Sequence, residues 1–188
     1  LNTAMSANDD LIANQLPVSI NGTPANDTLA GNALNNVIAG GAGLDTVSFS
    51  GARGQYNITV NGGTVVVSVL VSGRDGIDTL TNVERLRFVD KSVALDLSAS
   101  AGVVAKVIGA VFGASSLVSL PSVGLGLKLM DGGMLYSDLM QYALNARLGT
   151  GASDALVVNL LYTNVMGVAP GAAELTYFTG LLRAGQYT

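Results

Sequence analysis

The chain contains no cysteine and no histidine, and these two absences exclude several kinds of chemistry. Without cysteine it has neither disulfides nor a thiol nucleophile, and without histidine it lacks a Ser-His-Asp triad and zinc sites of the usual kind. Charged residues are also scarce, at 12% of the 188 residues. The net charge is −4 and basic residues are not clustered, so we expect no nucleic-acid partner.

The shortage of charge leaves a mean hydropathy of +0.47, which is too apolar for a disordered chain. Two long uncharged runs cover residues 107–127 and 155–173. A membrane span needs ~20 mainly apolar residues, but glycine and either Pro121 or Pro170 interrupt each run. We therefore expect buried helix pairs and no membrane span.

Three nine-residue segments follow one another between Gly22 and Ser48, namely GTPANDTLA, GNALNNVIA and GGAGLDTVS. Each begins with glycine, has Asp or Asn at its sixth position and has an aliphatic residue at its eighth. A nine divides naturally into a six-residue turn and a three-residue strand, so two nines make one coil, with one strand in each of two facing sheets. The eighth-position side chains should then form the core between the sheets: Leu29, Ile38 and Val47.

The same geometry places Asp27 directly above Asp45, because they are two nines, and so one full coil, apart. Two bare carboxylates that close repel each other, and a hard divalent cation between them would remove the repulsion. Glycine-rich turns offer carbonyl oxygens as further ligands. We therefore predict a Ca²⁺ site formed by the two aspartates and by the turn residues Gly22, Gly40 and Ala42.

Asn36 and the aspartates of a fourth nine decide how many Ca²⁺ sites the sequence predicts. Asn36 falls on the opposite edge, and its stacking partner is expected within residues 13–18, which contain no acid, so the three nines hold one site. A fourth nine runs from residue 73 to residue 81, with glycine first, Asp sixth and Leu eighth. Its Asp75 and Asp78 either complete a second Ca²⁺ site or belong to an ordinary surface turn.

The segment GGAGLDTVS matches the RTX nonapeptide, GGxGxDx followed by a large apolar residue and any residue, and the two preceding nines look like variants of it. Residues 45–97 resemble the strand-rich segment that often closes such repeats in secreted bacterial proteins. The helical half resembles a helical domain of unknown function often found after it. The resemblance implies a parallel β-roll that binds calcium, type I secretion to the cell exterior, and a role as toxin, protease, lipase, adhesin or surface-layer protein.

We predict an α+β chain in three parts. These are an N-terminal segment or cap over residues 1–21, a calcium-binding β-roll and β-sheet over 22–97, and an α-helical domain over 98–188. Residues 64–71 are uncharged and rich in β-branched residues, which predicts a strand that is either exposed at an edge or central. Helical apolar spacing predicts helices near 100–112, 122–130, 134–147, 154–166 and 171–184.

The helical half also repeats weakly, since residues 104–114 match residues 158–168. The second copy ends before the counterpart of helix 134–147. Either that helix is simply missing from the chain, or a neighbouring subunit fills its place, with residues 1–17 as a candidate, in a head-to-tail assembly. In the second case an exposed apolar groove should be bordered by Leu160, Leu161, Tyr177, Phe178 and Leu181.

Nothing in the chain favours an enzyme. The possible carboxylate pair Asp131 and Asp138 flanks a Gly-Gly turn, and GLGLK lacks the spacing of a phosphate-binding loop. We expect a secreted, non-enzymatic structural or adhesive module of a bacterial cell-surface assembly, such as an S-layer, filament or adhesin, that associates with itself. The alternative is a folding and secretion module cut from a larger RTX toxin or hydrolase.

Overall fold

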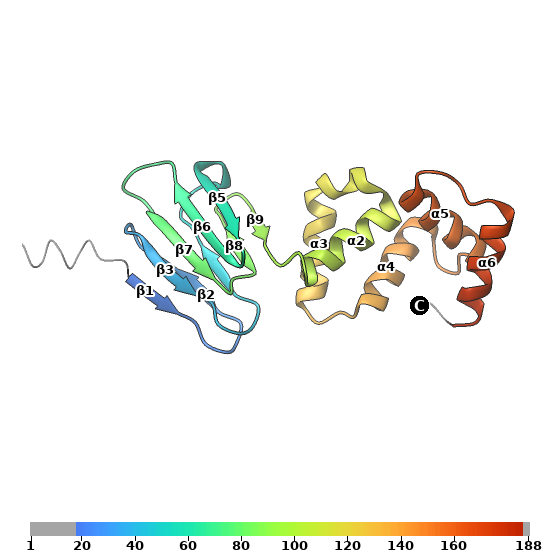
Figure 1. Cartoon of the computed structure of the whole chain (residues 1–188), viewed down its shortest axis with the longest axis horizontal. Coiled ribbons are helices and arrows are strands. Elements are labelled where there is room, and N and C mark those ends of the chain that lie inside the picture. Colours follow the sequence, from blue (N-terminus) through green and yellow to red (C-terminus); the bar gives the residue numbers. More distant parts are fainter. Residues whose placement is uncertain (1–17, 186–188) are drawn as a thin grey trace, which may run out of the picture. The chain divides into compact units, whose positions relative to one another are not determined.

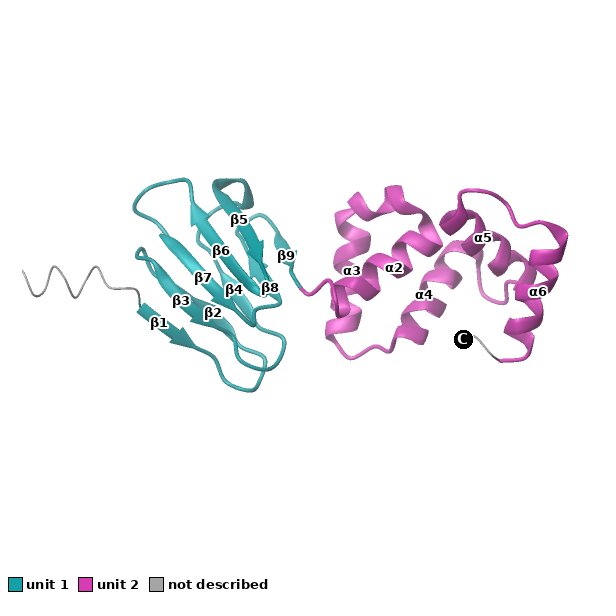
Figure 2. Ribbon diagram, viewed as in Figure 1, with its two compact units in different colours: residues 1–95 teal, residues 96–188 magenta. Residues whose placement is uncertain are grey.

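The computed structural model describes residues 18–185 and has the predicted α+β composition, with strands in the N-terminal half and helices in the C-terminal half (Figure 1). It divides into two compact units, Leu1–Leu95 and Asp96–Thr188 (Figure 2). The boundary lies two residues before the predicted one. Of the expected N-terminal segment, Val18–Asn21 form a strand, and residues 1–17 lie outside the described range.

The strand unit consists of two sheets. The first has five strands in the order β1 (Val18–Asn21), β3 (Asn36–Ala39), β7 (Ile77–Thr81), β6 (Thr64–Val69) and β5 (Tyr56–Asn61). The second has four strands in the order β2 (Thr28–Ala30), β4 (Thr46–Ser48), β8 (Arg85–Arg87) and β9 (Ser92–Ala94). A short 3-10 helix, η1 (Arg53–Gln55), precedes β5.

The register of the first four strands follows the nine-residue period. Strands β1 and β3 are parallel, as are β2 and β4, and in both pairs the partners are two nines apart, for example Thr28 and Thr46. Ile38 and Val47 are fully buried in the core, and Leu29 is half-buried against it. The eighth position of each nine therefore packs between the sheets, as the sequence predicts.

The expectation of a parallel β-roll is wrong for the unit as a whole, because both sheets are mixed. Strand β7 continues the first sheet in parallel beside β3, and β8 continues the second beside β4. Strands β5, β6 and β9, however, pair antiparallel. The two-residue turn Gly62–Gly63, with φ of 53° and 91°, forces β5 and β6 into a hairpin. Strand β6 is thereby central, between β7 and β5.

The helical unit contains α2 (Ser100–Phe112), the 3-10 helix η2 (Ala114–Val118), α3 (Leu120–Asp131), α4 (Tyr136–Leu148), α5 (Asp154–Met166) and α6 (Ala172–Arg183). Gly113 and Gly167, both with positive φ, end α2 and α5 and so divide the two uncharged runs. Ser153 caps α5, since its side chain accepts a hydrogen bond from the N–H of Leu156. None of the helices described has the length and apolar character needed to cross a membrane.

Candidate metal centre

Three acidic side chains stack along one edge of the strand unit, where successive turns lie one above another. The backbone N–H of Asp27 donates to Oδ1 of Asp45 over 2.8 Å, and the N–H of Asp45 donates to Oε2 of Glu84 over 2.8 Å. The stack follows from the parallel pairing of β2, β4 and β8, which each of the three residues precedes by one position. The structure thus brings the predicted pair Asp27 and Asp45 together and adds Glu84, which the nine-residue period does not reveal.

Asp45 is the fully buried member of this stack. Its Oδ1 accepts the hydrogen bond from Asp27, but its Oδ2 has no hydrogen-bond partner among the residues described. By contrast, Oδ2 of Asp27 accepts from both the N–H and the hydroxyl of Thr23, over 2.6 and 2.9 Å. A buried carboxylate oxygen without a partner is unfavourable, so Asp45 Oδ2 is the atom of this stack that gains most from a bound cation.

The turns require glycine because adjacent coils are in backbone contact. A Cβ added at Gly22 would overlap the carbonyl oxygen of Gly40, and one added at Gly40 would overlap that of Asn82. The latter Cβ would also lie 2.6 Å from Oδ2 of Asp45. Ala42 is exposed in the same turn as Gly40. The three predicted turn residues therefore lie in the two turns that carry the predicted aspartates.

These donors suit a hard cation, since they are carboxylate and carbonyl oxygens. Ca²⁺ takes six to eight such oxygens, with water completing the set. Within residues 18–185, no three His, Cys, Asp or Glu side chains are grouped so as to hold a metal ion. A Ca²⁺ ion beside Asp45 would therefore be held by one or two carboxylates, with backbone and water oxygens supplying the remaining ligands.

The opposite edge carries a second stack, in which Asn36 lies against Asp78. The N–H of Asn36 donates to Oδ1 of Asp78 over 2.9 Å, and Nδ2 of Asn36 lies 3.5 Å from the carbonyl oxygen of Val18. The spacing of two nines predicts a partner only within residues 13–18 and misses Asp78, which is 42 residues further along. The available signal is that Asp78 holds the sixth position of the fourth nine, as Asn36 does in the second.

The two aspartates of the fourth nine have different surroundings. Asp78 is buried, and burial raises its pKa to about 6, with the hydrogen bond from Asn36 lowering it and the charge of Asp75 raising it. Asp75 instead accepts from the N–H and hydroxyl of Ser50, over 3.1 and 3.0 Å, and from the hydroxyl of Tyr56. The structure therefore places Asp78 in the inner stack and Asp75 in a separate hydrogen-bonded loop.

The two stacks present carboxylate oxygens of the kind that a cation binds, and they tie each coil to the next through side-chain oxygens. Comparison with known proteins found no family model and no curated protein that matches the chain. The inference of function therefore depends on the residues and geometry described above.

Proposed function

We propose that this chain is a secreted, non-enzymatic module of a bacterial cell-surface assembly, with a structural or adhesive role and with Ca²⁺ as its stabilising ion. One observation carries the proposal: Asp45 is fully buried in stacked turns and its Oδ2 has no hydrogen-bond partner among the described residues. A Ca²⁺ ion beside Asp27 and Asp45 reduces their mutual repulsion and supplies the partner that Oδ2 lacks. The resemblance of GGAGLDTVS to RTX repeats supports the same ion.

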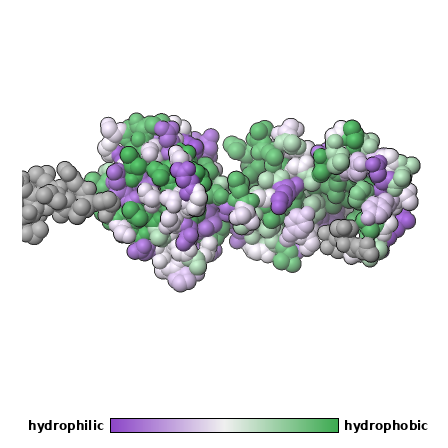
Figure 3. Space-filling view, in the orientation of Figure 1, coloured by the Kyte–Doolittle hydropathy of each residue, from purple (hydrophilic) through white to green (hydrophobic). Residues whose placement is uncertain are grey.

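Support for an assembly comes from the surface of the chain. Charged residues are few, and large apolar side chains are exposed in both units, including Val60 in the strand unit and Val118 and Val168 in the helical unit. On the face drawn in Figure 3, apolar residues (green) lie on parts of both units. The cavity between α5 and α6 gathers such side chains, including Val165, Tyr177 and Phe178. Contiguous apolar surface of this kind usually marks an interface, so self-association is the means by which the assembly forms.

The calcium part of the proposal is tested by calorimetric melts in Ca²⁺ and in chelator. At a hundredfold excess over Kd, an ion that binds only the folded state adds about 2.7 kcal/mol to the free energy of unfolding. The matched variant is Asp45→Asn, which removes the charge but keeps an oxygen for the N–H of Asp27. We expect the wild-type strand unit to melt higher in Ca²⁺ and the variant to lose most of that difference.

The control is Asp90→Asn, which removes an exposed acid of the same unit that lies outside both stacks. It should keep the full response to Ca²⁺. Wild-type melts that coincide in Ca²⁺ and chelator, or an Asp45→Asn variant that responds fully, would show that the ion does not bind here. Electron microscopy tests the assembly: regular lattices or filaments are expected, whereas dispersed monomers at all concentrations would contradict it.

A further inference from the structure

An incomplete coil lies at one end of the strand unit. A complete coil has one strand in the second sheet followed by one in the first, as β2 is followed by β3. Strand β1 belongs to the first sheet and pairs in parallel with β3, with partners 18 residues apart, such as Ile20 and Ile38. Its companion in the second sheet would lie beside β2. Within residues 18–185 that position holds no strand, and β2 is the edge (Figure 1).

The core is less covered at this end than one coil further in. Ile38 and Val47 are fully buried, whereas their counterparts one coil earlier, Ile20 and Leu29, are only half-buried. Both counterparts pack against the same core cluster. A strand beside β2 would lie against the free side of Leu29, as β4 lies against its other side.

The backbone of β2 also has a donor directed at this position. The N–H of Thr46 donates to the carbonyl oxygen of Asp27 over 2.9 Å, and the N–H of Arg85 donates to that of Asp45 over 2.9 Å. Thr28 is the register partner of Thr46. Equivalent groups of parallel strands point in the same direction, so the N–H of Thr28 points away from β4, toward the open edge. An open edge of this kind favours the addition of a further strand.

The sequence before β1 matches the sequence that contains β2. Residues 7–14 read ANDDLIAN, and residues 25–32, which come 18 residues later, read ANDTLAGN. The offset equals the separation of register partners in both parallel pairs at this end, β1 with β3 and β2 with β4. Residues 10–12 are therefore the counterpart of β2. Five of the eight positions are identical: Ala7, Asn8, Asp9, Leu11 and Asn14.

We propose that residues 7–14 complete the coil by pairing in parallel with β2, with residues 10–12 as the added strand. The inference goes beyond the proposed function, because the coil depends on strand pairing and apolar contact and not on an ion. Leu11 then covers Leu29, and Asp9 lies beside Asp27. The N–H of Thr28 donates to the carbonyl oxygen of Asp9, as that of Thr46 does to Asp27 one coil later.

Two side-chain contacts between coils support the same register. Oδ1 of Asn26 accepts a hydrogen bond from the N–H of Leu44, 18 residues later, over 2.9 Å. Asn8 is the counterpart of Asn26, so its Oδ1 can accept from the N–H of Asn26 in the same way. The N–H of Asp27 donates to the aspartate of the next coil over 2.8 Å, and Asp9 is the counterpart of Asp27. Residues 7–14 therefore carry the side chains that tie one coil to the next, at the required spacing.

The proposed coil begins at residue 7 because the turn before it departs from the nines. A Cβ at Gly22 would overlap the carbonyl oxygen of Gly40 in the next coil, and the position equivalent to Gly22 is occupied by Ala4. Asp10 takes the place of Thr28, whose side chain is exposed, so its charge stays in water. A charge on an edge strand also opposes pairing with other chains.

The chain has no cysteine, so an engineered disulfide can test the register in the full chain. Neighbouring strands lie about 4.8 Å apart, a separation that a disulfide can bridge. Asp10→Cys with Thr28→Cys should form a disulfide within one chain under mild oxidation, as measured by mass spectrometry. The positive control is Thr28→Cys with Thr46→Cys, which are register partners. Ser6→Cys with Thr28→Cys is out of register and should react at least about tenfold more slowly.

Amide hydrogen exchange measured by NMR tests the coil without cysteine. The N–H of Thr28 should exchange at least about tenfold more slowly than an open amide, and Leu11→Asp should remove this protection. The N–H of Thr46 lies one coil further in and should stay protected in the variant, which shows that the unit is still folded. Met5→Asp places the same charge outside the matched residues and should leave Thr28 protected.

Each of four results would overturn the inference. They are equal rates of disulfide formation for the Asp10→Cys and Ser6→Cys pairs, an unprotected Thr28 amide in the wild type, protection that survives Leu11→Asp, and a disulfide that forms only between chains. The last would assign the position beside β2 to a second copy. All measurements are made with Ca²⁺ present, and the calcium proposal is tested by melts alone, so either proposal can fail without the other.

Discussion

Asp78 should make the strand unit less stable as the pH rises. Its carboxyl has an ordinary pKa of 3.8 in the unfolded chain, and burial raises this pKa to about 6 in the folded protein. Below pH 3.8 both states hold the proton. As the pH rises, the unfolded chain releases the proton first, whereas the folded protein retains it until the pH approaches its raised pKa. The stability that this group contributes is therefore fully present at low pH and is lost as the pH rises to about 6.

The size of the effect follows from the shift in pKa. Each unit corresponds to about 1.4 kcal/mol, so a rise of this size costs about 2–3 kcal/mol of unfolding free energy at neutral pH. Asp78→Asn removes the buried charge and keeps an oxygen that can accept from the N–H of Asn36. We expect the variant to be more stable than the wild type by about 2–3 kcal/mol near pH 7 and to differ little below the ordinary carboxyl pKa.

Urea unfolding at a series of pH values measures this difference. Chelator should be present throughout, because a bound cation would itself favour the charged carboxylate. Subtracting the wild-type free energy from that of Asp78→Asn at each pH removes the contribution of the other titrating groups. Asp90→Asn, which removes an exposed acid of the same unit outside both stacks, is the control for the loss of one negative charge. Parallel curves for the wild type and Asp78→Asn would refute the reasoning that a buried charge at this position is unfavourable.

Two further predictions concern the core and the turns of the strand unit. Ile38→Ala should cost about 3–5 kcal/mol in urea unfolding, and Leu29→Ala about 2 kcal/mol, because Ile38 is fully buried and Leu29 half-buried; equal, near-zero costs would mean that the eighth positions do not form the core. Gly22→Ala should destabilise the unit, because the added Cβ would overlap the carbonyl oxygen of Gly40 in the next coil. The control is Gly54→Ala, whose added Cβ meets no atom within 4 Å and which should change the free energy of unfolding by less than about 0.5 kcal/mol. A destabilisation of equal size in both glycine variants would contradict the close stacking of the turns.

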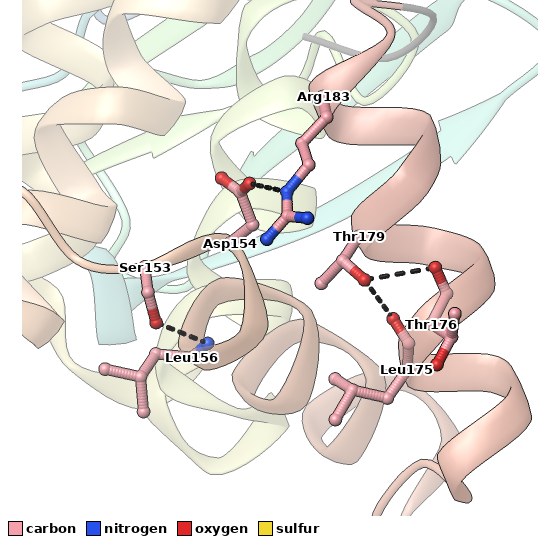
Figure 4. Close-up of polar contacts among 7 residues, drawn as sticks. All are labelled: Ser153, Asp154, Leu156, Leu175, Thr176, Thr179 and Arg183. Atoms are coloured by element: carbon pink, nitrogen blue, oxygen red, sulfur yellow. Dashed lines mark hydrogen bonds and ion pairs between the residues drawn. The ribbon is translucent and has the colours of Figure 1, made fainter.

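Features set by local sequence could be predicted well. The nine-residue period fixes the register of β2 on β4, two nines later, because each strand follows a turn of constant length. Helices α2 and α5 begin and end at the predicted residues, since Gly113, Ser153 (Figure 4) and Gly167 mark three of their four ends. Each of these signals acts within a few residues of the feature it determines.

Features set by distant residues could not be predicted in the same way. Glu84 is 39 residues from Asp45, and Asp78 is 42 residues from Asn36, although both pairs are stacked neighbours. The β5–β6 hairpin is inserted between these coils. Residues that stack in adjacent coils are therefore no longer two nines apart in the sequence. The strand propensity of residues 64–71 does not determine whether this strand pairs parallel or antiparallel. The Gly62–Gly63 turn determines it, because it makes β5 and β6 a hairpin.

The hairpin also limits how far the stacked turns can extend. In a parallel roll each new coil adds parallel strands to both sheets, but here β6 occupies the edge of β7 and β9 occupies the edge of β8, both antiparallel. The parallel ladder therefore ends at β7 and β8, and the acidic stack ends with it at Glu84. Calcium at this stack would stabilise a unit of fixed size and would not drive the growth of a long roll. Assembly of many chains then requires a separate surface, outside the stacked turns.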